Sequence, residues 1–490
     1  MGFHHIGKRL YRADCPVAEG SLGRVVAGFG AEVVVGHPTF KNENTIGNEL
    51  YRGVKAAAEV YKGKNVAFVV SDGSYRMDMP EDSTLKAALE GAEKALSELD
   101  RASSEHIMVI AAAYDGYKGD RTPGKGSALK ILYDELGYCP TLRELILLDG
   151  DLRNELKPWF KVFSQVEASH RQTRKGKDFF ITARYARHFV DASLTRFVVG
   201  PLTTLMGEYV PGGISGDIVL SAGAVQHERN AEWDKNRRRY GTDIATTFDN
   251  IADPHIAIYE VYLGAKLHEI TDEAKLSVMP GEVIGAALER LLYYQRLDGR
   301  VEKLLGQDVP LAQPHTWGPE KTGIGFIDPG YTEVFDVDFK RMILVDKFYL
   351  YRDAIKKVLV PETFGQIKKA LSRLQQTRAD DRDQFIFLGV SSGMWIEILY
   401  QAMGYLLSKK DPETVKLCLN YLYTAAFLEF CREKIISLGG DTFGKVRSMQ
   451  SCLGAPPHKA SQFYEREVDG AAKKMALEFY NDRRKILSYM

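Results

Sequence analysis

The sequence of 490 residues has little cysteine, no net charge and no long uninterrupted apolar run. The cysteines are Cys15, Cys139, Cys418, Cys431 and Cys452. They are scattered, odd in number and form no CxxC pair, so neither a disulfide framework nor a cysteine-based metal site is expected. A reducing, cytoplasmic location is the simplest interpretation of this pattern.

Neither sign of charge is in excess, because Lys plus Arg and Asp plus Glu each number 65. A nucleic-acid partner is therefore not indicated. The N-terminal residues lack the apolar centre of a signal peptide. The most apolar stretch, 415–431, contains Lys416, Asn420 and Glu429 and is predicted to be a buried helix. We expect a soluble protein without stable membrane insertion.

The length predicts more than one domain. From about residue 31 to 275, short apolar runs alternate with helical patterns, which predicts a doubly wound α/β sheet that is mainly parallel. The expected strands lie in AEVVVGHP, NVAFVVSDGS, HIMVIAAAYDG, ELILLDGD and HIAIYEVYLG. Residues 1–30 form an N-terminal extension with no assigned place.

From residue 276 to 490 the strand signal disappears and long amphipathic helices predict a mostly α-helical C-terminal domain. The run Asp411, Pro412, Glu413 is typical of a helix start, with a capping Asp and Pro at the first helical position. We expect this domain to support a homo-oligomer. The Gly- and Pro-rich stretch 314–330 is predicted to be loop.

Candidate ligand-binding residues follow the predicted strands, where doubly wound sheets bind ligands. The first strand stops at Pro38, and the next loop contains Lys41, Asn42 and Glu43. Asn42 and Glu43 could contact a nucleotide base or ribose, and Lys41 a phosphate. An ordinary loop with a capped helix explains the same residues. Asp72 could bind the imide N–H of a base, although Asp-Gly-Ser is also a turn signal.

The stretch 123–127, PGKGS, precedes a predicted helix and combines backbone amides with the Lys125 cation, an arrangement suited to a diphosphate. It is not a Walker A loop, because Gly126 intervenes between Lys125 and Ser127. It is not the GxGxxG of a dinucleotide-binding fold either.

Asp149 and Asp151 end the run ELILLDGD and form a DxD pair, which could bind Mg²⁺ or Mn²⁺ beside a diphosphate. A lone DxD is common and is weak evidence. Downstream, Asp217 follows clustered glycines that permit close approach to a sugar, and Asp243 follows an arginine-rich run. His268 lies just past a strand and could be a third metal ligand, although a single His is more often structural.

Taken in this order, the motifs resemble those of the GT-A glycosyltransferases. The chain is similar to the mannosylglycerate synthase family, which is retaining, and more distantly to glucosyl-3-phosphoglycerate synthase. The resemblance spans residues 31–275 through PGKGSAL, LLDGD, GGISGD, YGTD and IYEVYLGAKLH, and continues weakly through MWIEILYQAMGYLL.

The resemblance implies a role for each matching residue. Asp151 and His268 would be metal ligands, together with Asp149, which would also contact the donor. Pro38, Lys41, Glu43, Asp72 and Lys125 would bind the donor nucleotide and its phosphates. Arg187, Asp191 and Thr195 match the residues that hold the acceptor. Asp243 and Asp217 would lie near the donor sugar, and the carbonyl of Ile214 near the reacting carbon.

The chain departs from the family pattern at two places. Ser193 stands where relatives that use phosphoglycerate have an arginine, which argues against a phosphorylated acceptor. The family's GGE is SGD here, which leaves the identity of the donor sugar undecided.

The resemblance therefore implies a metal-dependent, retaining hexosyltransferase. It would move mannose or glucose from a GDP- or UDP-sugar to D-glycerate or a similar small hydroxy acid, giving a compatible solute such as mannosylglycerate or glucosylglycerate. The alternatives are a transferase with a phosphorylated or lipid-linked acceptor, a sugar-1-phosphate nucleotidyltransferase, and a non-catalytic protein that binds sugar nucleotides.

Overall fold

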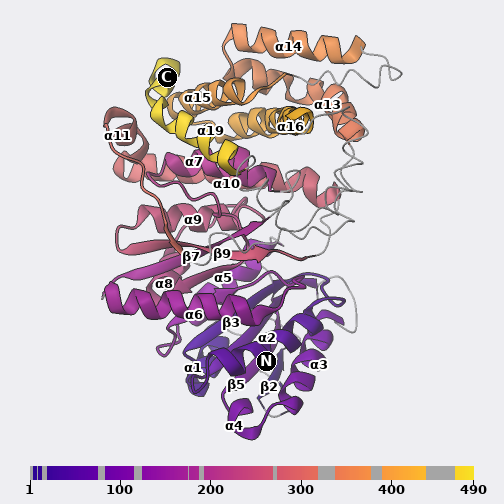
Figure 1. Ribbon diagram of the computed structural model, residues 1–490, viewed down its shortest axis with the longest axis vertical. Helices are drawn as coiled ribbons and strands as arrows, with labels where there is room; N and C mark the ends of the chain where they lie inside the picture. Colours follow the sequence, from indigo (N-terminus) through magenta and orange to yellow (C-terminus); the bar gives the residue numbers. More distant parts are fainter. Residues whose placement is uncertain are drawn as a thin grey trace. The chain divides into compact units, whose positions relative to one another are not determined.

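The computed structural model divides into two compact units that interleave along the chain (Figure 1). Unit 1 comprises residues 1–185, 214–269 and 314–320, and unit 2 comprises 186–213, 270–313 and 321–490. The residues described are 4–7, 9–13, 19–74, 83–114, 124–174, 176–186, 192–268, 273–317, 337–376, 389–437 and 469–490. Each unit is described by itself below.

Unit 1 is built on one ten-stranded sheet with the order β1-β2-β5-β4-β3-β6-β8-β7-β9-β10. The strands are β1 (His4–Gly7), β2 (Leu10–Ala13), β3 (Val33–Thr39), β4 (Val66–Asp72), β5 (Ile107–Ala113), β6 (Glu144–Leu147), β7 (Asp178–Ala186), β8 (Ile218–Ser221), β9 (Ile256–Ala265) and β10 (His315–Trp317). The strands β2, β5, β4, β3 and β6 are parallel to one another, whereas β1 is antiparallel to β2, and β8 is antiparallel to both β6 and β7.

Helices cover both faces of this sheet, which is why β3, β4 and β5 are buried along their whole length. The helices are α1 (Ser21–Phe29), α2 (Ile46–Val60), α3 (Ser83–Glu98), α4 (Arg101–Ser104), α5 (Lys125–Leu136), α6 (Leu156–Thr173), α8 (Ala222–Asn230) and α9 (Thr242–Ala252). Apolar residues of α2, α3 and α6 share one core with the sheet. Helix α5 packs on β3 and β4 and against α1, α8 and α9.

The predicted α/β sheet with a helical C-terminal part is confirmed, and all five expected strands are present. The antiparallel strand β8 and its partner β7 were not expected. The N-terminal residues now have a place, because Leu10–Ala13 pairs with β5 at one side of the sheet. The expected loop at 314–330 contains β10, and residues 318–330 lie outside the described part.

The described elements of unit 2 are helical. They are η2 (Thr195–Val199), α7 (Gly200–Thr204), α10 (Glu273–Asp298), α11 (Arg300–Gly306), α13 (Val337–Val358), α14 (Pro361–Gln376), α15 (Ser392–Lys409), α16 (Pro412–Ser437), α19 (Gly470–Asn481) and η4 (Arg483–Tyr489). Helix α16 begins at Pro412, and Asp411 Oδ1 accepts the Thr414 N–H at 3.1 Å, as the capping pattern predicted. None of the described helices has the length and apolar composition to cross a bilayer.

The core of unit 2 is centred on α15. Trp395 is fully buried, and its indole N–H donates to the carbonyl of Phe197 at 2.8 Å. Tyr400 donates its hydroxyl toward the carbonyl of Phe479, with the two rings stacked 5.1 Å apart. The polar atoms of these two buried rings thus have hydrogen-bond partners, as burial in an apolar core favours.

One buried carboxyl group in unit 1 has no hydrogen-bond partner among the described residues. Glu144 begins β6 and is 1 % exposed, and neither of its carboxylate oxygens is hydrogen bonded. Burial raises the pKa of Glu144 to about 7, and the nearby Glu167 carboxylate adds to the effect. Between about pH 4.5 and pH 7 the folded protein therefore keeps a proton on Glu144 that the unfolded chain loses.

We expect Glu144→Gln to remove part of the pH dependence of stability. A carboxyl group with a raised pKa in the folded state stabilises at low pH, and this contribution is lost as the pH rises through about 7. The free energy of unfolding of the wild type should fall by on the order of 2–3 kcal/mol more than that of the variant between pH 5 and pH 8. Urea unfolding at the two pH values measures this, and parallel losses in both proteins would contradict it.

Candidate active site

The carboxyl ends of β3, β4 and β6 meet at one edge of the sheet, because these strands are parallel neighbours. The predicted DxD pair lies there, directly after β6 and the buried Leu148. Asp149 and Asp151 are both partly buried. The loop that follows β3 and the turn that follows β4 reach the same edge, as predicted from the order of motifs.

Asp149 is paired with two lysines. Its Oδ1 lies 2.7 Å from the Lys125 ammonium, and its Oδ2 lies 2.6 Å from the Lys266 ammonium. Burial alone would raise the pKa of Asp149, but the two ammonium groups outweigh it and hold the pKa well below its usual range. Asp149 is therefore ionised at any ordinary pH.

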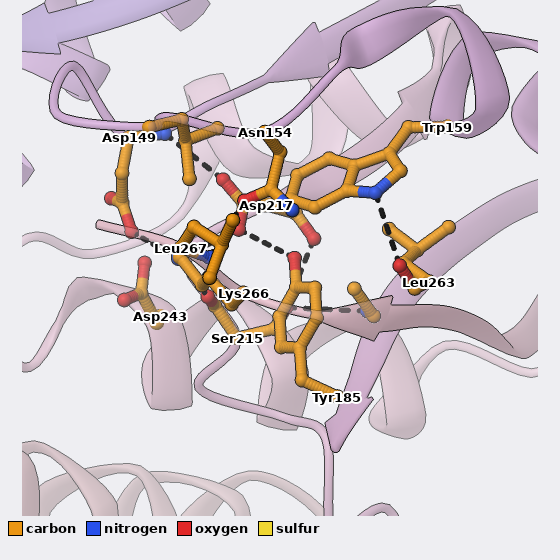
Figure 2. A network of polar contacts seen from close by, with 12 residues as sticks. Asp149, Asn154, Trp159, Tyr185, Ser215, Asp217, Asp243, Leu263, Lys266 and Leu267 are labelled. Atoms are coloured by element: carbon orange, nitrogen blue, oxygen red, sulfur yellow. Dashed lines mark hydrogen bonds and ion pairs between the residues drawn. The ribbon is translucent and has the colours of Figure 1, made fainter. Parts of the chain in front are cut away.

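Asp217 faces inward and supports Asp149 (Figure 2). It is fully buried, and its Oδ1 accepts the backbone N–H of Asp149 at 3.0 Å. Its Oδ2 accepts the hydroxyl of Tyr185 and lies 2.6 Å from the Lys266 ammonium. Lys266 also donates to the carbonyl of Ser215 at 2.9 Å. One lysine thus binds oxygen atoms from three residues.

The close approach of Asp149 to this cluster depends on a glycine. Gly216 has a φ of +81°, in the region that favours glycine, and a Cβ built on it would lie 2.3 Å from Asp149 Oδ2. The clustered glycines were predicted to admit a sugar. At Gly216 the group that occupies the space is the Asp149 carboxylate of the same chain.

Asp243 completes the cluster from the first turn of α9. Its Oδ2 lies 3.1 Å from the Lys125 ammonium, so Lys125 links Asp243 to Asp149. Its Oδ1 is buried without a hydrogen-bond partner among the described residues. Burial raises the pKa of Asp243, and the negative charge of Asp149 adds to this, against the opposing effect of Lys125.

Asp151 and His268 belong to two segments that are hydrogen bonded to each other. The Arg153 N–H donates to the carbonyl of Leu267 at 2.8 Å, and the Leu267 N–H donates to Asn154 Oδ1 at 2.7 Å. Burial and the Asp149 charge raise the pKa of Asp151, whereas His268 is close enough to act in the opposite direction.

The described residues contain no complete metal site, since no three His, Cys, Asp or Glu side chains are grouped as ligands. Asp151 and His268 form at most a partial set. Mg²⁺ in phosphate-handling sites is commonly held by one or two carboxylates together with substrate phosphates. The partial set is compatible with a cation that arrives with a diphosphate.

The predicted donor-binding residues lie on the loops after β3 and β4. Pro38 is buried within β3, and Lys41 is exposed with a φ of +56°, a strained conformation for a lysine. Glu43 is exposed and accepts the hydroxyl of Thr84 at 3.2 Å. The donor-binding role of these residues stays a prediction.

Asp72 is fully buried and both its oxygens have partners within the chain. Oδ1 accepts the hydroxyl of Thr39 at 2.8 Å, and Oδ2 accepts the hydroxyl of Ser74 at 2.6 Å. These contacts match the turn that the Asp-Gly-Ser sequence also predicted. The nucleotide-binding role of Asp72 stays a prediction.

The predicted anion-binding amides of 124–127 are partly engaged elsewhere. The Gly126 N–H donates to the carbonyl of Arg239 at 3.2 Å, and the Ser127 N–H donates to that of Arg238 at 2.9 Å. A Cβ on Gly126 would lie 1.9 Å from the carbonyl of Arg237, so this glycine admits another segment of the chain. Two of the loop's amides are thus bonded within the chain, and the diphosphate-binding role of the loop stays a prediction that rests on the Lys125 side chain.

The acceptor-binding prediction falls mostly outside the described residues, since Arg187 and Asp191 lie there. Thr195 begins η2 in unit 2 and is partly buried. Ile214 is also partly buried, in the turn before Ser215.

The sequence interpretation missed Lys266, Tyr185 and Ser215. A lysine at the carboxyl end of a predicted strand, two residues before His268, was the available signal. Tyr185 and Ser215 gave none, because their contact with the site depends on the antiparallel pairing of β7 with β8.

No family model matches the chain, and no curated protein matches it. Solved structures do. Glucosyl-3-phosphoglycerate synthase from Mycobacterium tuberculosis with Mn²⁺, uridine-diphosphate-glucose and phosphoglyceric acid is 19 % identical, with a TM-score of 0.36 over 56 % of this chain and 85 % of that chain. Its complex with phosphoglyceric acid is 20 % identical, with a TM-score of 0.37 over 58 % and 87 %. A further mycobacterial protein is 18 % identical, with a TM-score of 0.37 over 54 % and 78 %.

Of the two enzymes that the sequence resembles, these structures represent the more distant one. The same enzyme has also been solved with Mg²⁺ and uridine-diphosphate. At this level of identity and structural similarity the likeness decides neither substrate nor residue roles.

Proposed function

We propose that this chain is a glycosyltransferase that transfers a hexose from a nucleoside diphosphate sugar to a small hydroxy acid, with retention at the anomeric carbon. The observation that carries the proposal is the pair of ammonium groups, Lys125 and Lys266, fixed among Asp149, Asp217 and Asp243. A departing nucleoside diphosphate gains negative charge. Cations held in place before the reaction stabilise that charge without reorganisation.

The charge balance of the cluster favours an additional divalent cation. Four carboxylates (Asp149, Asp151, Asp217 and Asp243) face two ammonium groups, which leaves two negative charges when all are ionised. Burial and then the Asp149 charge raise the pKa of Asp151, and Asp243 Oδ1 is buried without a hydrogen-bond partner among the described residues. Asp151 and His268, supported by Asp149, would hold Mg²⁺ or Mn²⁺. When bound, the metal supplies Lewis-acid stabilisation of the diphosphate.

The chain's own residues have distinct proposed tasks. Lys125 would bind the diphosphate, and Lys41, Glu43, Pro38 and Asp72 would surround the nucleotide. Asp243, linked to Lys125, would orient the donor sugar. Asp217 would act through Asp149, and the Ile214 carbonyl would lie near the reacting carbon. No protein nucleophile is assigned, so the acceptor hydroxyl would attack on the face that the diphosphate leaves.

The proposed acceptor is D-glycerate or a similar small hydroxy acid, held by Arg187, Asp191 and Thr195. Ser193 favours an acceptor without phosphate, since a serine supplies no charge for one. In unit 2 the Ser193 hydroxyl contacts the Tyr423 hydroxyl, which is also uncharged. The product would be mannosylglycerate or glucosylglycerate. Self-association through unit 2 stays a prediction that light scattering can test.

The decisive experiment is a matrix of donors and acceptors with Mg²⁺ or Mn²⁺. GDP-mannose, GDP-glucose and UDP-glucose are each incubated with D-glycerate, 3-phosphoglycerate or buffer alone. We expect one donor to react with glycerate at least about tenfold faster than with 3-phosphoglycerate, since a phosphate without charge compensation is poorly bound. The anomeric configuration of the product, determined from the one-bond C1–H1 coupling in its NMR spectrum, should match that of the donor.

Other outcomes identify the alternatives. Preference for 3-phosphoglycerate would refute the acceptor assignment while leaving a glycosyltransferase. Conversion of a nucleotide sugar and pyrophosphate into nucleoside triphosphate and hexose-1-phosphate would indicate a nucleotidyltransferase. Binding of a donor by calorimetry with no turnover for any acceptor would indicate a protein that only binds sugar nucleotides.

A further inference from the structure

The loop after β6, residues 149–154, is held by one face of α2. Thr45 Oγ1 donates to the carbonyl of Gly150 at 2.8 Å, and Glu49 Oε2 accepts the Leu152 N–H at 3.1 Å. Arg52 continues the same face, because positions 45, 49 and 52 are four and three residues apart. Because these hydrogen bonds are made to backbone atoms, they hold the loop in place independently of its side chains.

Arg52 extends this hold to Asn154. Its Nη2 donates to the carbonyl of Leu152 at 2.7 Å, and its Nε donates to the carbonyl of Asn154 at 3.0 Å. The backbone of Asn154 is thereby tied to α2, a long and well-packed helix. The side chain of Asn154 binds a different segment, because its Oδ1 accepts the Leu267 N–H at 2.7 Å (Figure 2).

Leu267 lies between the two site residues that come from the end of β9, Lys266 and His268. Its carbonyl accepts the Arg153 N–H at 2.8 Å, so two hydrogen bonds join this residue to the loop. The two strands that deliver the site residues, β6 and β9, are not neighbours in the sheet. No direct strand pairing therefore joins their ends, which are connected by these two hydrogen bonds and by the ion pair of Lys266 with Asp149.

We propose that Asn154 is a positioning residue, which holds the segment bearing Lys266 and His268 against the loop bearing Asp149 and Asp151. The effect on metal binding rests on the proposed function. The hydrogen bonds that hold the two segments together are seen in the structure whatever the function is. The role proposed for Asn154 requires no direct contact with substrate or metal. It acts through the backbone of Leu267, as residues behind a metal-binding His commonly act on metal affinity.

The test compares Asn154→Ala with Asn154→Asp. Alanine removes the acceptor for the Leu267 N–H, whereas aspartate keeps an oxygen in the same place. Mn²⁺ binding is measured first without a nucleotide and then with UDP or GDP, by the electron paramagnetic resonance signal of the free ion. We expect Asn154→Ala to bind Mn²⁺ about 10- to 100-fold more weakly than the wild type. Asn154→Asp should stay within about threefold of the wild type, because it retains the hydrogen bond.

A matched control is available in the same unit. Asn65 Nδ2 donates to the carbonyl of Phe29 at 2.9 Å, and its Oδ1 lies 2.7 Å from His106 Nδ1. It therefore also ties backbone through an amide, but before β4 and not at the carboxyl edge of the sheet. Asn65→Ala should leave Mn²⁺ affinity unchanged, which separates a positioning effect from general loosening of the fold.

Hydrogen exchange supplies a readout that needs no metal. The Leu267 amide should exchange faster in Asn154→Ala and not in Asn65→Ala. Unchanged exchange, or wild-type Mn²⁺ affinity in Asn154→Ala, overturns the positioning role and leaves the proposed function standing. A wild-type protein that binds no Mn²⁺ even when UDP or GDP is present overturns the proposed metal site and this inference with it.

Discussion

Asp151→Asn is expected to lower metal-dependent hexose transfer by about 10²–10³-fold and to leave the fold intact. Asp151 is the predicted direct metal ligand, and asparagine keeps its shape while removing its charge. The pKa of Asp151 is raised by burial and by Asp149, so the charge is unfavourable for the fold itself. The midpoint of thermal unfolding should therefore be unchanged or slightly higher. Initial rates at saturating Mn²⁺, with a thermal melt of the same sample, measure both.

The matched control is Asp100→Asn, a change of the same kind at an exposed position. Asp100 caps the short helix α4, where its Oδ1 accepts the Ser103 N–H at 2.8 Å. Asparagine caps a helix about as well, so neither activity nor stability should change. Full activity of Asp151→Asn in Mn²⁺ would remove Asp151 from the proposed metal site.

Arg237→Met is expected to reduce the free energy of unfolding by about 3–5 kcal/mol. The guanidinium of Arg237 is fully buried, with Nη1 2.6 Å from Asp249 Oδ2 and Nη2 2.6 Å from Glu228 Oε2. It also lies over the Trp233 ring, 4.4 Å from the ring centre. Methionine fills much of the volume but leaves two carboxylates buried without their cation. Urea unfolding measures the loss.

Two comparisons show whether the uncompensated charge causes this loss. Adding Glu228→Gln to Arg237→Met should recover part of the stability, because one of the two stranded charges is then gone. Arg101→Met removes an arginine whose side chain is 86 % exposed and paired with Glu105, and should have no measurable effect. A loss below about 1 kcal/mol for Arg237→Met would show that the carboxylates are compensated in another way.

Local patterns predicted much of the architecture. The apolar runs ending in Asp72 and Leu147, and the capping sequence at Asp411, are each encoded within a few residues. Glu135 shows the limit of such patterns. It accepts the backbone N–H groups of Gly20 and Leu22 at the start of α1, at 2.7 and 2.9 Å, across more than a hundred residues. A cap supplied from so far away leaves no local signal.

Only part of the candidate site was predicted, because local patterns do not show which distant residues meet. Asp149, Lys125 and Asp243 were singled out from the sequence, and the structure brings them together. Lys266 was not, because its partners Asp149 and Asp217 are 117 and 49 residues away in sequence. The hydrogen bonds of the Gly126 and Ser127 amides could not be predicted from the sequence, because the segment that accepts them, 238–239, precedes α9 and is brought there by tertiary packing.

The buried carboxylate of Asp243 is unfavourable for stability but useful for the proposed activity. One of its oxygens has no hydrogen-bond partner among the described residues, and its ionised form is disfavoured by burial and by Asp149. The same negative charge helps to hold Lys125 in place. A neutral residue there would relieve the protein of an unfavourable charge and would deprive the site of an anchor. At this position a substitution that raises thermal stability is thus expected to lower the proposed activity.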